Sequence, residues 1–154
     1  MSATDALRKL GTFLFWLAIA IFAGTIVELA ATKLWQEPVQ LIPFAACAIG
    51  LIALVIAYLR PTRASQLALR GVMAAVTVVS LIGVWEHLEG NAGFVREMHP
   101  KATGLDLWIP VLTGRAPIGA SGILAIGALL ALASTWTLVV VTPDRAKKLE
   151  LATA

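Results

Sequence analysis

Four long apolar runs constrain the fold of this chain more than any other feature of its sequence. Charged residues make up only 14% of its 154 residues, against about a quarter in ordinary soluble domains. A transmembrane helix needs about 20 consecutive apolar residues to cross a hydrocarbon core of about 30 Å. Each of the four runs comes near this length, at about 10–31, 39–59, 67–85 and 118–141. We therefore expect most of the chain to lie in a lipid bilayer.

The predicted fold is an all-α membrane protein with four transmembrane helices in an antiparallel bundle. Short links between the apolar runs leave no room for a separate soluble domain, so 1–154 is expected to be a single four-helix transmembrane domain. Its expected helices cover about 10–32, 39–59, 67–89 and 118–141, joined at the outer end by a loop over 90–117.

The outer loop is expected to be partly ordered. Gly90 and Asn91 are residue types that favour a helix C-terminus, which predicts that the third helix ends before them. Farther along, 104–114 is apolar but too short to span, and it carries Trp108, a residue type found at the headgroup level. We expect an interfacial turn of helix here, limited by Pro110 and covering the outer end of the bundle.

The distribution of charge predicts the orientation. Lys and Arg gather near the cytoplasmic ends of transmembrane helices. With the N-terminus inside, the inner segments hold eight Lys or Arg and three acids, and the outer segments hold four Lys or Arg and six acids. The net charge is therefore +5 (8 − 3) inside and −2 (4 − 6) outside. Both termini are therefore expected in the cytoplasm, and the compact loops favour a bacterial inner membrane. The inner cations favour anionic lipid headgroups as partners over nucleic acid.

Small and polar residues predict the faces through which the helices pack. Helices in lipid associate through small residues that allow close approach and through polar side chains that need partners. The expected faces are, in chain order, Ala20, Gly24, Glu28 and Thr32; Cys47, Gly50, Leu54 and Tyr58; Met73, Thr77, Ser80, Val84, His87 and Asn91; and Gly127, Ala131, Ser134 and Leu138.

Glu28 is the carboxylate that most needs explanation, because it lies well inside an apolar run. A charge at mid-membrane costs about 2.5–3.5 kcal/mol on insertion scales, so it needs a partner. The first and third helices both run outward, which places Glu28, Glu86 and His87 at a shared depth within about one turn. Three alternatives stay open for Glu28: a hydrogen bond to His87 that joins two helices, a bound cation, or a proton.

A metal centre is the most specific of these alternatives. Mixed imidazole and carboxylate ligands suit divalent Zn, Mn, Fe or Cu. The candidate metal ligands are Glu28, Glu86, His87, Glu89, Glu97 and His99. Their spacing matches no established ligand motif, and no catalytic residue is assigned.

The function expected from these features is that of a small inner-membrane accessory or binding protein with a Glu and His cluster at its periplasmic end. One alternative is a metal-dependent membrane enzyme that uses the same cluster, although no Gly-rich phosphate loop, G-x-S-x-G motif or cysteine pair is present. The other is a purely structural subunit or assembly factor of a larger membrane complex. The expected partners are the lipid bilayer and a membrane protein or a second copy of the chain.

Overall fold

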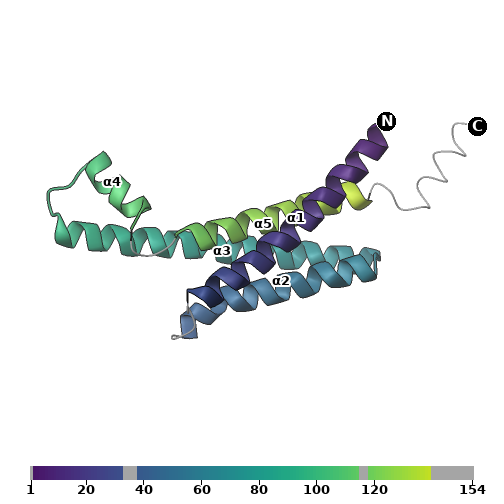
Figure 1. The fold of residues 1–154 in the computed structure, drawn as a ribbon, viewed down its shortest axis with the longest axis horizontal. Coiled ribbons are helices and arrows are strands. Elements are labelled where there is room, and N and C mark those ends of the chain that lie inside the picture. The colour runs from purple at the N-terminus through teal and green to yellow at the C-terminus, as the bar shows by residue number, and fades with distance from the viewer. Residues whose placement is uncertain (1, 33–37, 115–117, 140–154) are drawn as a thin grey trace, which may run out of the picture.

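A computed structural model describes residues 2–32, 38–114 and 118–139. These residues form helices and no strand, so the expected all-α class is confirmed for them (Figure 1). The elements are α1 (Ala3–Ala31), η1 (Pro38–Gln40, a single 3-10 turn), α2 (Leu41–Leu59), α3 (Arg63–Met98), α4 (Leu105–Leu112) and α5 (Ile118–Val139).

Three of the helices, α1, α2 and α3, are long and apolar enough to cross a membrane. The described part of α5 contributes a shorter apolar stretch, Ser121–Trp136. The predicted end of the fourth helix, at 141, lies outside the described residues. Length and composition thus indicate a membrane protein, as the apolar runs predicted.

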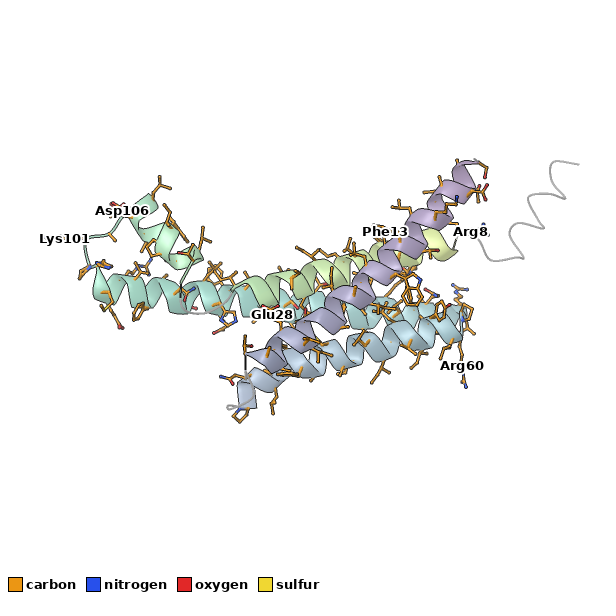
Figure 2. All side chains as sticks on the ribbon, in the orientation of Figure 1. Arg8, Phe13, Glu28, Arg60, Lys101 and Asp106 are labelled. Carbon is orange, nitrogen blue, oxygen red and sulfur yellow. The ribbon has the colours of Figure 1, made fainter. Side chains whose placement is uncertain are left out.

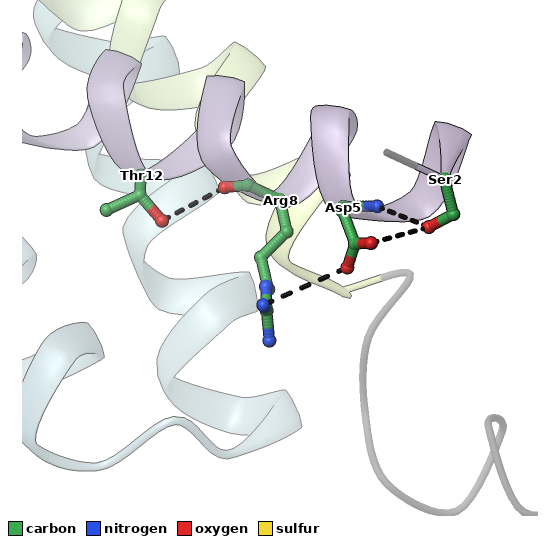
Figure 3. A network of polar contacts seen from close by, with 4 residues as sticks. All are labelled: Ser2, Asp5, Arg8 and Thr12. Atoms are coloured by element: carbon green, nitrogen blue, oxygen red, sulfur yellow. Dashed lines mark hydrogen bonds and ion pairs between the residues drawn. The ribbon is translucent and has the colours of Figure 1, made fainter.

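Helix α1 begins well before its expected start at about residue 10, because its N-terminus is capped. The Ser2 hydroxyl accepts a hydrogen bond from the Asp5 backbone N–H at 3.1 Å (Figure 3). Such a cap satisfies one of the backbone donors that a helix start leaves unpaired. Helix α3 also begins earlier than predicted, at Arg63, where Thr62 and Ser65 form a capping box.

The four long helices pack in a ring of neighbours. Helix α5 makes its main contacts with α1 and α3, and α2 contacts the same two helices. Direct contact between α1 and α3 is at most marginal, so these two helices lie diagonally opposite each other. In Figure 1 the N-terminal end of α1 and the C-terminal end of α5 lie at the end of the bundle where α2 is joined to α3. Successive long helices therefore run in opposite directions.

The core is built around Phe22 of α1, which is fully buried. Gly50 of α2 faces it so closely that a Cβ there would lie 2.9 Å from Cδ1 of the ring and closer still to Cε1. On the other side, a Cβ on Gly127 of α5 would lie 3.3 Å from Cε2 of Phe22 and 2.7 Å from Cγ2 of Ile21. The two glycines thus leave the space that this part of α1 fills, and the three helices approach closely there.

The predicted packing face of α1 is wrong. Its four members, Ala20, Gly24, Glu28 and Thr32, are all exposed. The buried face consists instead of Gly11, Phe15, Ala18, Phe22, Thr25 and Leu29. The physical reason is that close approach needs a small residue on only one of two helices, and here the glycines of α2 and α5 supply it.

The other three predicted faces agree with the structure in most of their members. On α3, Met73, Ser80 and Asn91 are buried and Thr77, Val84 and His87 are partly buried; on α5, Gly127, Ala131 and Ser134 are buried; on α2, Cys47, Gly50 and Leu54 are buried. The side chain of Leu138 lies outside the described set. Tyr58 is the exception, since it is exposed and its ring contacts Phe15 and Trp16 with centroids 5.9 and 5.6 Å away.

Helix α3 does not end before Gly90, and this prediction is corrected. It continues without interruption to Met98, so the loop expected over 90–117 begins with helix. Its 36 residues extend over about 54 Å, well beyond a hydrocarbon core of about 30 Å. The local preference of Gly90 and Asn91 for a helix end is overridden because Asn91 is buried against α4.

Candidate functional site

The distal part of α3, 86–98, and α4 form a helical hairpin beyond the bundle, which we call the arm (Figure 1). The turn between the two helices contains Gly104 with φ +58°, a left-handed conformation that favours glycine. Its carbonyl accepts the Trp108 N–H at 3.1 Å and so opens α4. The short helix expected within 104–114 is thus present, and with eight residues it is two turns long despite Pro110. Its expected position is wrong, because it packs on the distal part of α3 and does not cover the outer end of the bundle (Figure 1).

Asn91 fixes α4 onto α3. Its side chain is 4% exposed, and its Nδ2 donates a hydrogen bond to the Val111 carbonyl at 2.9 Å. Val111 is fully buried, and a Cβ on Gly114 would lie 2.8 Å from Cγ of Asn91. Sequence reasoning missed this role, although it placed Asn91 on the packing stripe of α3, which was the signal that could have revealed it.

The structure does not bring Glu28 and His87 into contact. Glu28 is exposed on α1, whereas His87 is partly buried on α3. These helices are diagonal in the bundle, and α5 packs against both of them. Figure 2 shows Glu28 on the half of α1 nearer its C-terminus. Within the described residues, no hydrogen bond or ion pair joins the two side chains.

The remaining candidate ligands are dispersed along the arm. Glu86, Glu89, Glu97 and His99 are all exposed. Across 2–32, 38–114 and 118–139, no group of three or more His, Cys, Asp or Glu side chains is placed to hold a metal ion. The metal centre therefore stays a prediction, without support from the geometry of these residues.

The outward face of α4 carries an apolar stripe that the structure leaves uncovered. Leu105, Trp108, Ile109 and Leu112 follow the spacing i, i+3, i+4 and i+7, so they lie on one face of the helix. Between 53% and 75% of each residue remains exposed. The buried Val111 lies on a different side of α4, so the helix is apolar on more than one side.

An open depression of about 720 Å³ lies at the tip of the arm. Its walls are mostly apolar, with one cation and one anion, Lys101 and Asp106, which Figure 2 labels beside the α3–α4 turn. Other lining residues are Met98, His99, Leu105, Ile109 and Pro110. The depression adjoins the apolar stripe, because Leu105 and Ile109 belong to both.

The opposite end of the bundle is basic. Figure 2 labels Arg8 and Arg60 there, far from Lys101 and Asp106. At the start of α1, Arg8 lies 3.9 Å from the Asp5 carboxylate, and the Ser2 hydroxyl also contacts Asp5 at 2.9 Å (Figure 3). Both charged side chains are more than half exposed, so this network caps the helix and contributes little further stability.

No protein-family model, curated protein or solved structure matches the chain.

Proposed function

We propose that the chain is a four-span protein of a bacterial inner membrane with both termini in the cytoplasm. Helix α5, at 22 residues, extends over about 33 Å and matches the hydrocarbon thickness. The alternating directions of α1, α2, α3 and α5 support four crossings. The excess of cations at the end of the bundle where α1 begins and the described part of α5 ends supports the orientation.

Cysteine labelling tests this topology. In a Cys47→Ser background, Arg60→Cys and Lys101→Cys each place one thiol at an exposed position on opposite ends of the molecule. A membrane-impermeant maleimide applied to intact spheroplasts should label the Lys101→Cys variant and leave Arg60→Cys unlabelled until the cells are lysed. The reverse pattern would show that the orientation is inverted.

We further propose that the protein is a non-enzymatic accessory component, which uses its arm to bind a membrane-protein partner at the periplasmic face. The uncovered apolar stripe of α4 carries this proposal. A short helix with four exposed large apolar side chains at helical spacing resembles half of a helix-in-groove interface. Trp108 at the centre of the stripe is of the residue type that dominates binding energy at such interfaces.

A binding role also fits the arrangement of the polar residues better than catalysis does. General acid and base groups must lie within hydrogen-bond reach of a common reacting atom. The described carboxylates of the arm and His99 are instead exposed along its length, and His87 is partly buried. No three of these groups are placed around one metal ion. Elemental analysis of protein purified without chelators provides a separate check, since one equivalent of Zn, Mn, Fe or Cu per chain would favour the metal-dependent alternative.

Site-specific photo-cross-linking in native membranes tests the binding role. A photoreactive residue at Leu105 lies on the stripe, and one at Glu89 lies on an exposed polar position of the same arm. We expect a discrete adduct from position 105 that disappears in a Trp108→Asp background, with no such adduct from position 89. Its mass identifies the partner as another membrane protein or a second copy. Equal adducts from both positions, or none, would contradict the proposal.

A further inference from the structure

Arg70 is a cation inside the bundle whose described partner is neutral. It lies on α3 about two turns after the start of the helix and is partly buried. Its Nε donates to the Thr135 hydroxyl of α5 at 2.9 Å, and its Nη2 donates to the Thr135 carbonyl at 3.4 Å. Within the described residues, no carboxylate forms an ion pair with this guanidinium. A guanidinium has five N–H donors, so three are left for another acceptor.

Thr135 holds the guanidinium in a fixed orientation. The threonine is fully buried, and its hydroxyl donates to the Leu132 carbonyl at 2.7 Å while it accepts from Arg70. The hydroxyl therefore cannot rotate without breaking one of the two bonds. This arrangement preorganises Arg70, which lowers the entropic cost of binding an anion.

The aromatic residues at this end place Arg70 at the depth of lipid headgroups. Trp136, the residue after Thr135, is 65% exposed, and Tyr58 and Trp16 form an exposed ring pair near the turn between α2 and α3. Trp and Tyr gather where membrane meets water. The guanidinium bonded to Thr135 therefore lies near the level at which phospholipid phosphates are found.

The net positive charge at the basic end of the bundle also favours binding of an anion. Among the described residues it holds five cations and one acid, a balance of +4 (5 − 1) from Arg8, Lys9, Arg60, Arg63, Arg70 and Asp5. Arg63 and Arg70 are seven residues apart on α3, so they share one face of the helix. A negatively charged headgroup at this level would be attracted to these cations.

We propose that Arg70, oriented by Thr135, binds the phosphate group of an anionic phospholipid in the leaflet at the basic end of the bundle. The planar fork of a guanidinium matches two phosphate oxygens, and the bond is charge-assisted. The site is independent of the arm and of the partner proposed for it. Inorganic phosphate offers the same chemistry, so the test below separates the two sources.

Native mass spectrometry of the full chain in a neutral detergent measures this site directly. Phosphatidylglycerol or phosphatidylcholine is titrated in at about 0.5 M salt, where the Debye length is only a few Å and exposed charges are screened. The unsubstituted protein should retain phosphatidylglycerol preferentially. Arg70→Gln should lower this retention about fivefold, which corresponds to about 1 kcal/mol, the typical net contribution of one hydrogen bond.

Arg60→Gln is the matched control, because Arg60 is exposed at the same end and its contribution is screened at this salt concentration. Thr135→Val keeps the charge and the shape but removes the hydroxyl that accepts from Nε, so a smaller loss of phosphatidylglycerol retention is expected. Arg70→Lys, which keeps the charge without the fork, guards against a folding defect and should also bind less lipid. Circular dichroism confirms that each variant is folded.

Two results would overturn the proposal. The first is that Arg70→Gln lowers phosphatidylglycerol retention no more than Arg60→Gln does, or leaves it unchanged. Either outcome would attribute the preference for phosphatidylglycerol to general surface charge. The other is displacement of phosphatidylglycerol by millimolar inorganic phosphate, which would make free phosphate the ligand. Retention of the lipid under that competition supports the lipid as the source.

Discussion

Substitution of Asn91 by alanine should release α4 from α3 while leaving the bundle intact. Helix α4 has eight residues and contains Pro110, and isolated helices shorter than about 12–15 residues are marginal in water. Its order therefore depends on its contacts with α3. The Asn91 to Val111 hydrogen bond is one of these contacts and is buried.

The magnitude follows from what the substitution leaves behind. Removing the Asn91 amide deprives the Val111 carbonyl of the donor shown in the structure, and a buried polar group left unpaired costs about 1–3 kcal/mol. Since about 1.4 kcal/mol is a factor of ten, the open form of α4 should become about 5- to 150-fold more populated. The Val111 side chain is unchanged in this variant, so the comparison tests the Asn91 side chain and not the apolar contact made by Val111.

Hydrogen exchange of the full chain in nanodiscs measures this opening. The Trp108 and Thr113 amides, bonded to Gly104 and Ile109 carbonyls at 3.1 and 3.0 Å, report on the two ends of α4. In Asn91→Ala their exchange should accelerate by the same factor, while peptides of the core keep their rates. Glu89→Ala, at an exposed position on the same arm, serves as the control. Unchanged exchange in α4 would refute the assignment of Asn91 as its anchor.

Four further substitutions test helix packing, helix propensity and the exposure of Glu28. Gly50→Ala should destabilise the bundle by about 1–3 kcal/mol in an unfolding titration in mixed micelles, because the new methyl overlaps Phe22. Gly24→Ala is the control, since its Cβ would meet nothing within 4 Å, and it should be neutral or stabilising. Similar losses of stability from both substitutions would contradict the close approach of α1 and α2. Gly93→Ala should stabilise the arm by about 1 kcal/mol, seen as slower exchange over 86–98, because its Cβ also meets nothing within 4 Å. Glu28→Gln should change the unfolding free energy by less than about 0.5 kcal/mol, as expected of an exposed position, and a loss of about 3 kcal/mol or more would instead reveal a buried charge pair.

The apolar runs predicted the positions of the long helices because hydropathy over about 20 residues is a direct consequence of the thickness of a bilayer. The packing face of α3 was also predictable, since Met73, Ser80 and Asn91 repeat at helical spacing and are buried. The packing face of α1 was not predictable from the sequence. A glycine on one helix can receive a large side chain from its neighbour, as Gly50 receives Phe22, so small residues on a helix do not by themselves identify its contact face.

The candidate site was harder to predict than the helices, because it depended on which helices are neighbours. Matching depths allowed Glu28 and His87 to meet only if α1 and α3 were adjacent. Helix α5, the last helix in the part of the chain that the structure describes, packs against both of them. Periodicity within one helix carries no information on this order. The arm was missed for a related reason: the local signal at Gly90 was outweighed by the contact between Asn91 and α4, two segments that are distant in sequence.

The unbroken course of α3 has a mechanical consequence. Arg70 and Asn91 lie on the same uninterrupted helix, 21 residues and about 32 Å apart, with no proline and no irregular turn between them. The arm and the basic end of the bundle are therefore joined through the backbone of one helix. A displacement of the arm can thus reach the level of Arg70 along continuous helical hydrogen bonds, without passing through contacts between separate elements.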